Sequence, residues 1–483
     1  MNIAHFHRLR PAALLASSLT ALMLLAGIPA QAQTATDASE PAFRALYKEL
    51  VEINTTLSVG SCTQAAEAMA ARLQAAGLPA ADMQILAPPE RPKDGSLIAV
   101  LRGHDAKALP ILLLAHIDVV EAKREDWKRD PFTLVEENGF FYARGASDDK
   151  AMAAVFTDSL IRYQQSGFKP RRSIKLALTC GEETADTYNS VSWLLKTHPE
   201  ALKAAFALNE GAGGELDASG KPTVLQIQAG EKVYQDFQLE ISNTGGHSSR
   251  PVRDNAIYRL SAALSRLGAY QFPLALNPVT TAYFEAQSKI VPAEAASAMR
   301  AVLANPVDGP ATETLWSLNP GWNSMLRTTC VATQVNAGHA PNALPQRAQA
   351  NVNCRILPGV PVAAVQASLK QIFADDGIAI STVGEDAVIG PAPPLTAAML
   401  EPVKKIAKTL WPTAALVPTM STGATDSRFL NAAGIPSYGL SGMFHDAEGS
   451  HAHGLDERIR VKSLLDGRRF LYEVVKLYAM QPG

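Results

Sequence analysis

The chain has 483 residues, 47% of them hydrophobic and 19% charged, and its 44 basic residues nearly balance its 46 acidic ones. This length suggests two or three domains of about 100–200 residues each, and the composition excludes a disordered chain. The near-neutral net charge gives no sign of the excess positive charge that binds nucleic acid or anionic lipid, so neither is expected as a partner.

The first 32 residues have the layout of a secretory signal peptide. Arg8 and Arg10 precede an apolar stretch at 11–28, which is followed by a small-x-small sequence at 30–32. A membrane anchor would need about 18 or more strongly apolar residues, and hydroxyl side chains interrupt this stretch. We therefore expect 1–32 to be a signal peptide, and the mature protein to be periplasmic or secreted and not held in a membrane.

Helical and strand patterns alternate through the segment 33–231. Continuous apolar runs at 111–116, 173–180 and 204–210 are separated by helical stripes. Apolar strands with helices between them are typical of strands that are buried on both faces. This segment is therefore predicted to be α/β, with a mostly parallel sheet and helices on both faces.

The pattern changes at residue 232. Segments of alternating apolar residues follow, at 233–241, 326–335 and 348–357. They predict an open antiparallel sheet with helices on one face. We interpret 232–391 as an α+β domain that is inserted into the first one, whose helix–strand alternation resumes after a Pro-rich stretch and occupies 392–483.

The four cysteines can pair in an exported chain. Cys330 and Cys354 are the expected pair, because they lie in two alternating segments that can be neighbouring strands. Otherwise all four would be buried small apolar side chains. Cys180 in particular is expected to be a buried strand residue.

Metal-capable side chains follow each of the three buried strand candidates. The first runs into His116 and Asp118, the second into Glu182 and Glu183, and the third into Glu210. Because parallel strands place their carboxyl ends on one edge of a sheet, these side chains are expected to lie together. A loop aspartate and three late histidines are further candidates: Asp148, His445, His451 and His453.

Two histidines and three carboxylates suit a site for two zinc ions. Zinc takes nitrogen and oxygen ligands and leaves one position open for water. A carboxylate that bridges the two ions lets them share one hydroxide. Each signal is weak by itself, since an acid after an apolar strand can simply begin a loop.

Seven motifs occur in order along the chain: HID (116–118), DPF (130–132), RGASDDK (144–150), GEE (181–183), NEG (209–211), GGHSS (245–249) and AHGLDERI (452–459). Together they resemble those of the co-catalytic zinc exopeptidases and amidohydrolases, the family that includes aminoacylase, acetylornithine deacetylase, carnosinase and bacterial glutamate carboxypeptidase. The resemblance covers essentially the whole mature chain. Ala143 and Ala151 depart from it, because many relatives have glycine at these positions.

The resemblance implies two zinc ions per subunit, with Co²⁺ or Mn²⁺ as possible replacements. The implied ligands are His116, Asp148, Glu183, Glu210 and His453. Asp148 would be the bridging carboxylate. His453 fits the family spacing because acidic residues follow it three and four positions later, whereas His445 and His451 do not fit.

The resemblance also implies roles at the reacting bond. Glu182 would be the general base that takes a proton from water and passes it to the leaving amine. Asp118 would orient His116 through the second nitrogen of the imidazole ring. Glu182 and Glu183 are adjacent in extended chain and therefore point in opposite directions, so only one of them is expected to bind metal.

Residues of the inserted domain would complete the site. His247 would reach across a homodimer interface and stabilise the oxyanion in the partner's active site. Asn342 would bind substrate, and Arg355 would hold a substrate carboxylate. Without the resemblance, His247 is a turn histidine beside two glycines and Arg355 an exposed strand residue. Gly423 and Asp426 also fit the family and are expected to shape the site.

The resemblance therefore predicts an exported two-zinc metallopeptidase that cleaves small peptides with a free C-terminal carboxylate. Its α/β catalytic domain would be interrupted by a dimerisation lid. An aminoacylase that acts on N-acyl amino acids is the alternative within the family. An exported solute-binding protein and a metal-binding relative without catalysis are the non-enzymatic alternatives, and neither needs a complete ligand set with a general base.

Overall fold

The computed structural model describes residues 37–184, 187–307, 309–384 and 387–482. The predicted signal peptide at 1–32 lies outside these ranges. Within them, no helix has both the length and the apolar character that a bilayer span requires.

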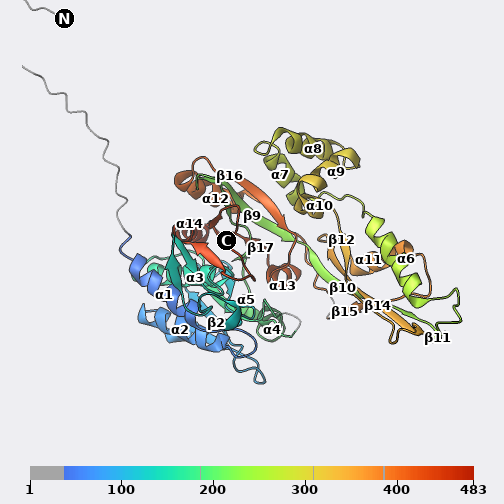
Figure 1. The fold of residues 1–483 in the computed structure, drawn as a ribbon. Helices are drawn as coiled ribbons and strands as arrows, with labels where there is room; N and C mark the ends of the chain where they lie inside the picture. Colours follow the sequence, from blue (N-terminus) through green and yellow to red (C-terminus); the bar gives the residue numbers. More distant parts are fainter. Residues whose placement is uncertain (1–36, 185–186, 308, 385–386, 483) are drawn as a thin grey trace, which may run out of the picture. The chain divides into compact units, whose positions relative to one another are not determined.

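The helices are α1 (Glu40–Glu52), α2 (Cys62–Ala75), α3 (Lys150–Gln165), α4 (Ser190–Thr197), α5 (Pro199–Leu202), α6 (Ala256–Ala269), α7 (Pro278–Gln287), α8 (Ala293–Ala304), α9 (Gly309–Leu318), α10 (Pro320–Leu326), α11 (Val362–Phe373), α12 (Ala397–Leu410), α13 (Ser427–Ala432) and α14 (Val461–Met480). The strands are β1 (Met83–Leu86), β2 (Ser96–Leu101), β3 (Ile111–His116), β4 (Val135–Glu137), β5 (Phe140–Tyr142), β6 (Ile174–Thr179), β7 (Phe206–Asn209), β8 (Gly214–Leu216), β9 (Pro222–Glu231), β10 (Val233–Ser242), β11 (Gly246–His247), β12 (Thr329–Ala337), β13 (Ala343–Leu344), β14 (Arg347–Ile356), β15 (Ala379–Val383), β16 (Ala415–Ser421), β17 (Ser437–Gly439), β18 (Phe444–His445) and β19 (Arg458–Arg460). Figure 1 labels most of them along the chain.

The largest sheet has the strand order β1-β2-β6-β3-β7-β17-β9-β8-β18, and β16 pairs with β9. The central strands β6, β3, β7 and β17 run parallel to one another. Leu113 of β3 packs in a core with α1, α2, α3 and α14, whereas its neighbours Leu112 and Leu114 pack with α4 and α13. Helices therefore cover both faces, which confirms the predicted α/β fold with a mostly parallel sheet.

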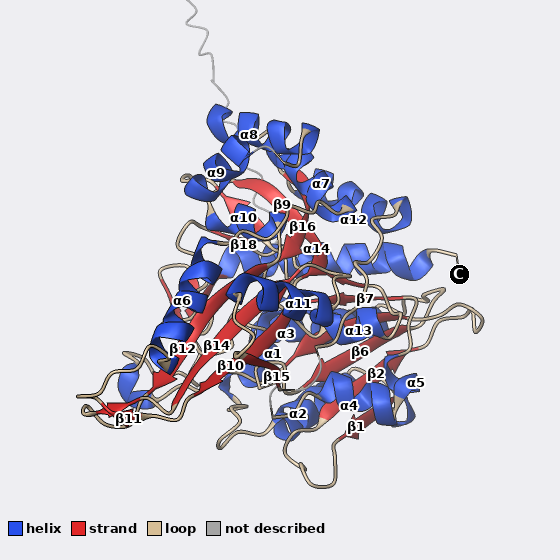
Figure 2. Ribbon diagram, turned by 90° about the vertical axis from the view of Figure 1, so that its right-hand side faces the viewer, coloured by secondary structure: helices blue, strands red, loops and turns tan. Residues whose placement is uncertain are grey.

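A second sheet has the order β12-β14-β10-β15, with every neighbouring pair antiparallel. Figure 2 shows α6 and α11 lying across one face of this sheet. Phe237, Leu260 and Leu369 from these elements share a separate hydrophobic core. This confirms the predicted antiparallel sheet with helices on one face.

The helices α7–α10 follow α6 and form one group (Figure 1). Their buried side chains, among them Phe284, Met299 and Leu315, belong to the same core as the large sheet. Helix α7 packs against β16. The sequence interpretation placed this segment inside the antiparallel block, so the limits 232–391 of an inserted domain stay a prediction.

Two disulfides join the four cysteines. Cys330–Cys354 links the register partners of β12 and β14, which confirms the expected pair. Cys62–Cys180 links the first residue of α2 to the residue after β6. Cys180 is buried, as expected, but its bond to Cys62 was not predicted, because this partner lies 118 residues away and leaves no local pattern.

Candidate metal centre

The predicted metal-capable side chains lie at one edge of the large sheet. β3 ends at His116, which is paired with Thr179 at the end of β6. Glu210 follows the last residue of the neighbouring β7. Parallel pairing of these three strands places their carboxyl ends at the same edge, as the sequence predicted.

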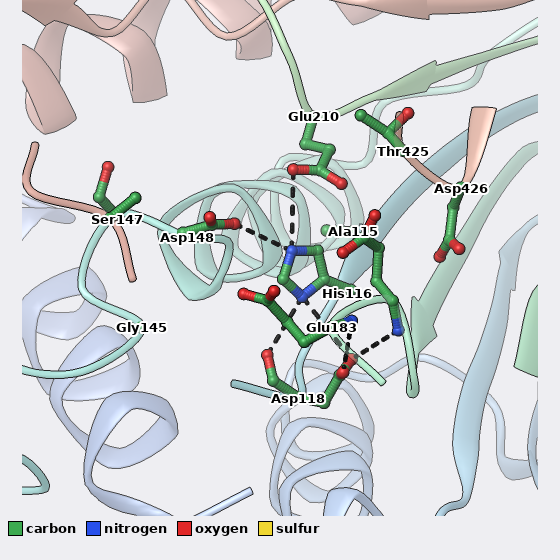
Figure 3. A network of polar contacts seen from close by, with 12 residues as sticks. Ala115, His116, Asp118, Gly145, Ser147, Asp148, Glu183, Glu210, Thr425 and Asp426 are labelled. Carbon is green, nitrogen blue, oxygen red and sulfur yellow. Dashed lines mark hydrogen bonds and ion pairs between the residues drawn. The ribbon is translucent and has the colours of Figure 1, made fainter. Parts of the chain in front are cut away.

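The five predicted ligands form two groups that share Asp148. His116 Nε2 lies 3.0 Å from Asp148 Oδ1 and 3.7 Å from Glu210 Oε2. His453 Nε2 lies 3.2 Å from Asp148 Oδ2 and 2.9 Å from Glu183 Oε1. Each carboxylate oxygen of Asp148 thus faces a different histidine. Figure 3 shows Asp148 and Glu210 on one ring nitrogen of His116 and Asp118 on the other.

The two groups have the donors and the charge that divalent metal ions require. In each group the ligand atoms lie within 4.8 Å of one another, and imidazole nitrogen with carboxylate oxygen suits zinc. Glu210 Oε1 is buried and has no hydrogen-bond partner among the described residues. Asp148 and Glu183 raise the pKa of His453 to about 10. Uncompensated negative charge therefore surrounds both histidines, and the residues fit two divalent ions.

Asp118 holds the segment that carries the two adjacent glutamates. The backbone N–H groups of Glu182 and Glu183 donate to its carboxylate, at 3.3 and 3.0 Å. His116 Nδ1 lies 3.6 Å from Asp118 Oδ1 and only 3.1 Å from the Asp118 backbone carbonyl. Asp118 therefore contacts the imidazole as predicted, with the shorter contact through its main chain.

Glu182 is half-buried and lies near other negative charges. Burial raises the pKa of its carboxyl group, and the charge of Glu210 raises this pKa further. The preceding Gly181 has φ of +93°, and an added Cβ there would meet the carbonyl oxygen of Tyr188 at 2.4 Å. Only glycine fits this turn, which directs the chain from β6 into the site.

The sequence assigned no role to Arg144 and Glu457, which form a buried ion pair, with Nη1 and Oε2 separated by 2.7 Å. Glu457 also accepts hydrogen bonds from the backbone N–H groups of Ser147 and Asp148, at 2.9 and 3.0 Å. Arg144 donates to the carbonyl of Gly454, at 3.0 Å. The pair thus fastens the Asp148 loop to the segment that carries His453.

Asp426, which was expected only to shape the site, is buried behind it. Thr179 Oγ1 donates to Asp426 Oδ2 at 3.2 Å, and Asn189 Nδ2 donates to Oδ1 at 2.6 Å. Asn189 Nδ2 also lies 3.2 Å from the carbonyl of Gly181. Asp426 therefore supports both sides of the loop that contains Glu182.

His247 and Asn342 lie together but outside both ligand groups. His247 is exposed on β11, which pairs with β13, and Ser249 Oγ lies 2.8 Å from its Nδ1. The backbone N–H of Ser248 donates to the carbonyl of Asn342 at 3.0 Å. The role predicted for His247 needs a second subunit, and the roles of both residues stay predictions.

Arg355 lies on β14, with its guanidinium 4.6 Å from the centre of the Tyr234 ring. Arg355 is half-buried, and not the exposed strand residue of the alternative interpretation. This burial lowers the pKa of its guanidinium group. Of the late histidines, only His453 joins a ligand group in the part of the chain that the structure describes; His445 and His451 do not.

A family profile, curated relatives and a solved structure all indicate the same protein family. The sequence profile of peptidase family M20/M25/M40 matches residues 112–477. The human N-fatty-acyl-amino acid synthase/hydrolase PM20D1 is 30% identical over 389 residues, which cover 79% of this chain and 76% of the relative. A probable carboxypeptidase S-like protein of Dictyostelium discoideum is 28% identical, with 79% and 74% covered. The M20 metallo-carboxypeptidase Sso-CP2 of Sulfolobus solfataricus shares the fold, with a TM-score of 0.67, 20% identity, and 90% and 99% of the two chains covered.

Proposed function

The chain belongs to peptidase family M20/M25/M40, whose members are metal-dependent peptidases and amidohydrolases, and on this premise we propose that it hydrolyses N-acyl amino acids. The observation that carries the proposal is the pair of ligand groups that share Asp148, with the half-buried Glu182 beside them. Two zinc ions are the proposed cofactors. The name of the human relative favours an N-acyl amino acid over a peptide.

Small peptides with a free C-terminal carboxylate are the second candidate, which the carboxypeptidase S-like relative favours. Both substrate classes have an amide bond whose nitrogen belongs to a residue with a free carboxylate. Arg355 would hold this carboxylate, because a guanidinium binds it through two parallel hydrogen bonds. The proposed chemistry is therefore the same for both classes.

Residues of this chain would bind, orient and move protons. When bound, two divalent ions would polarise the amide carbonyl and make a water molecule acidic enough to attack it at neutral pH. Glu182 would take the proton of this water and give it to the leaving nitrogen. Its raised pKa suits this role, because a carboxylate whose charge is disfavoured accepts a proton readily.

A homodimer is part of the proposal. β12 is an edge strand whose side chains are mostly exposed, including Val331 (56%) and Val335 (61%). The neighbouring α6 exposes Tyr258 by 70%. An unpaired edge with exposed apolar side chains favours pairing with a second copy. In such a dimer, the partner's His247 would stabilise the oxyanion.

Export to the periplasm or the outside of the cell is likewise proposed. The layout of 1–32 and the two disulfides support it, because disulfides persist in oxidising compartments.

The test compares an N-acyl amino acid, a dipeptide and the C-terminal amide of each, with zinc and with a chelator. We expect hydrolysis that the chelator abolishes, and that falls by at least about tenfold when the carboxylate is amidated. Equal rates on acids and amides would contradict the carboxylate requirement. Absence of hydrolysis by the zinc-loaded protein would contradict the proposed function and favour a binding protein.

A further inference from the structure

A cavity of about 330 Å³ lies between the strands β9 and β16 and the helices α7 and α10. Small-molecule sites typically have about 300–1,000 Å³. Tyr283 of α7 and Trp322 and Met325 of α10 line the cavity from the helices, and Thr419 and Met420 line it from β16. Part of the cavity wall is therefore formed by α7 and α10, which the sequence interpretation had placed inside the antiparallel block.

The lining of this cavity is neutral. None of the described residues that line it carries a charge. Trp322 Nε1 donates to the hydroxyl of Tyr283 at 2.9 Å, so these two polar atoms satisfy each other, and the ring faces offer apolar surface beside the amide and hydroxyl side chains that also line the cavity. Met325 and Met420 are buried, and their flexible side chains adapt to an apolar guest. A charged group would find no counter-charge among these residues.

The same cavity adjoins the candidate metal centre. Ala212, which lines it, stands two residues after the proposed ligand Glu210, and two residues of chain span at most about 7 Å. Gly211 between them lies directly against Gln228, another lining residue, since an added Cβ would meet Gln228 Oε1 at 2.4 Å. The loop that carries Glu210 therefore packs against the wall of the cavity.

We propose that this cavity is the subsite for an uncharged, apolar acyl group of the substrate, and this inference rests on the proposed function. An amide carbonyl at the two ligand groups would have its acyl chain beside the Glu210 loop, while Arg355 would hold the carboxylate of the amino acid.

The test uses N-acetyl-, N-octanoyl- and N-dodecanoyl-phenylalanine and measures the ratio of kcat/KM for the long and the short chains. Thr419→Trp fills the cavity at a half-buried strand position where tryptophan is a favourable residue. Asn319→Asp puts a negative charge at the rim, and because aspartate also caps helices, the cap of α10 is kept. Thr413→Trp, at an exposed turn outside the cavity, is the matched control.

We expect the wild-type protein and Thr413→Trp to prefer dodecanoyl over acetyl by at least about tenfold, and the two cavity variants to lose this preference. Hydrolysis with the same ratio in all four proteins would overturn the subsite and leave the proposed function intact. If nothing is hydrolysed, the proposed function fails, and calorimetric titration with N-dodecanoyl-phenylalanine decides the subsite. Binding that Thr419→Trp abolishes supports it, and equal binding by both proteins overturns it.

Discussion

After β6, Glu182 and Glu183 are neighbours in the chain with different surroundings. Glu183 contacts His453, whereas Glu182 belongs to neither ligand group of the described residues. We expect Glu182→Gln to lower kcat by about 100-fold or more and to keep both metal ions, because no ligand changes. Metal analysis beside kcat checks this, with Glu183→Gln as the variant that should lose metal. Normal turnover in Glu182→Gln would remove this residue from the mechanism.

Glu231, the last residue of β9, makes stability depend on pH. Its Oε2 accepts hydrogen bonds from the backbone N–H and Oγ1 of Thr425, and its Oε1 is buried without a partner among the described residues. Burial raises the pKa of Glu231 to about 8, against about 4.3 in an unfolded chain. At pH values between these two pKa values, the carboxyl group keeps its proton in the native state and releases it in the unfolded state. The free energy of unfolding therefore falls as the pH rises through this range.

The expected fall is at most about 1.4 kcal/mol per pH unit between these two pKa values. Glu231→Gln removes the titrating group and should flatten the profile, which urea unfolding at several pH values measures. Glu401→Gln, at an exposed helix position, is the control that should keep the wild-type slope. A wild-type slope in Glu231→Gln would show that this carboxyl group titrates normally.

At the scale of elements, the Cys62–Cys180 disulfide anchors the loop that follows β6. It closes 118 residues of chain, against 24 for Cys330–Cys354. Loop entropy gives upper values of about 5 and about 3.5 kcal/mol for the two bonds. We expect replacement of either pair by serine to lower the free energy of unfolding. Only the Cys62/Cys180 variant should also lower kcat at equal metal content, since Cys180 directly precedes the Gly181 turn. Equal kcat in both variants would refute this role.

The elements themselves were predictable where their pattern is local. The run at 111–116 is apolar on both faces and therefore predicts a strand inside an α/β sheet, which β3 is. The helix α7 shows why other parts were not. Tyr283 and Phe284 mark a buried face, but a helical stripe does not say which core it joins. The sequence therefore could not separate α7–α10 from the antiparallel sheet.

At the scale of the whole molecule, activity should depend on dimerisation. The double substitution Val331→Lys and Val335→Lys would oppose pairing of β12 with a second copy, because charged side chains on an edge strand block edge-to-edge association. We expect this double variant to be monomeric by light scattering and to lose activity by at least about tenfold, since the partner's His247 would be absent. Val383→Lys, on the opposite edge strand β15, is the control. A fully active monomer would contradict the role of His247.

The candidate site was predictable to the extent that its residues stand at strand ends or in motifs. His116 and Glu210 end apolar runs, and the resemblance to the family, through its spacing, selected His453 from three histidines. The role of Glu457 was not predictable, because its partners Arg144 and Ser147 precede it by more than 300 residues. Only the fold shows that one carboxylate accepts hydrogen bonds from the loop of the proposed bridging ligand.

The site can form only after both Arg144 and Glu457 have been synthesised, although they lie far apart in the chain. A ribosome makes the chain from its amino end, so His116, Asp148, Glu183 and Glu210 all exist well before residues 453–457. Until residues 453–457 are added, one group of ligands lacks its histidine, and the Asp148 loop lacks the carboxylate that accepts its hydrogen bonds. We therefore expect a chain that stops before residue 453 to be inactive.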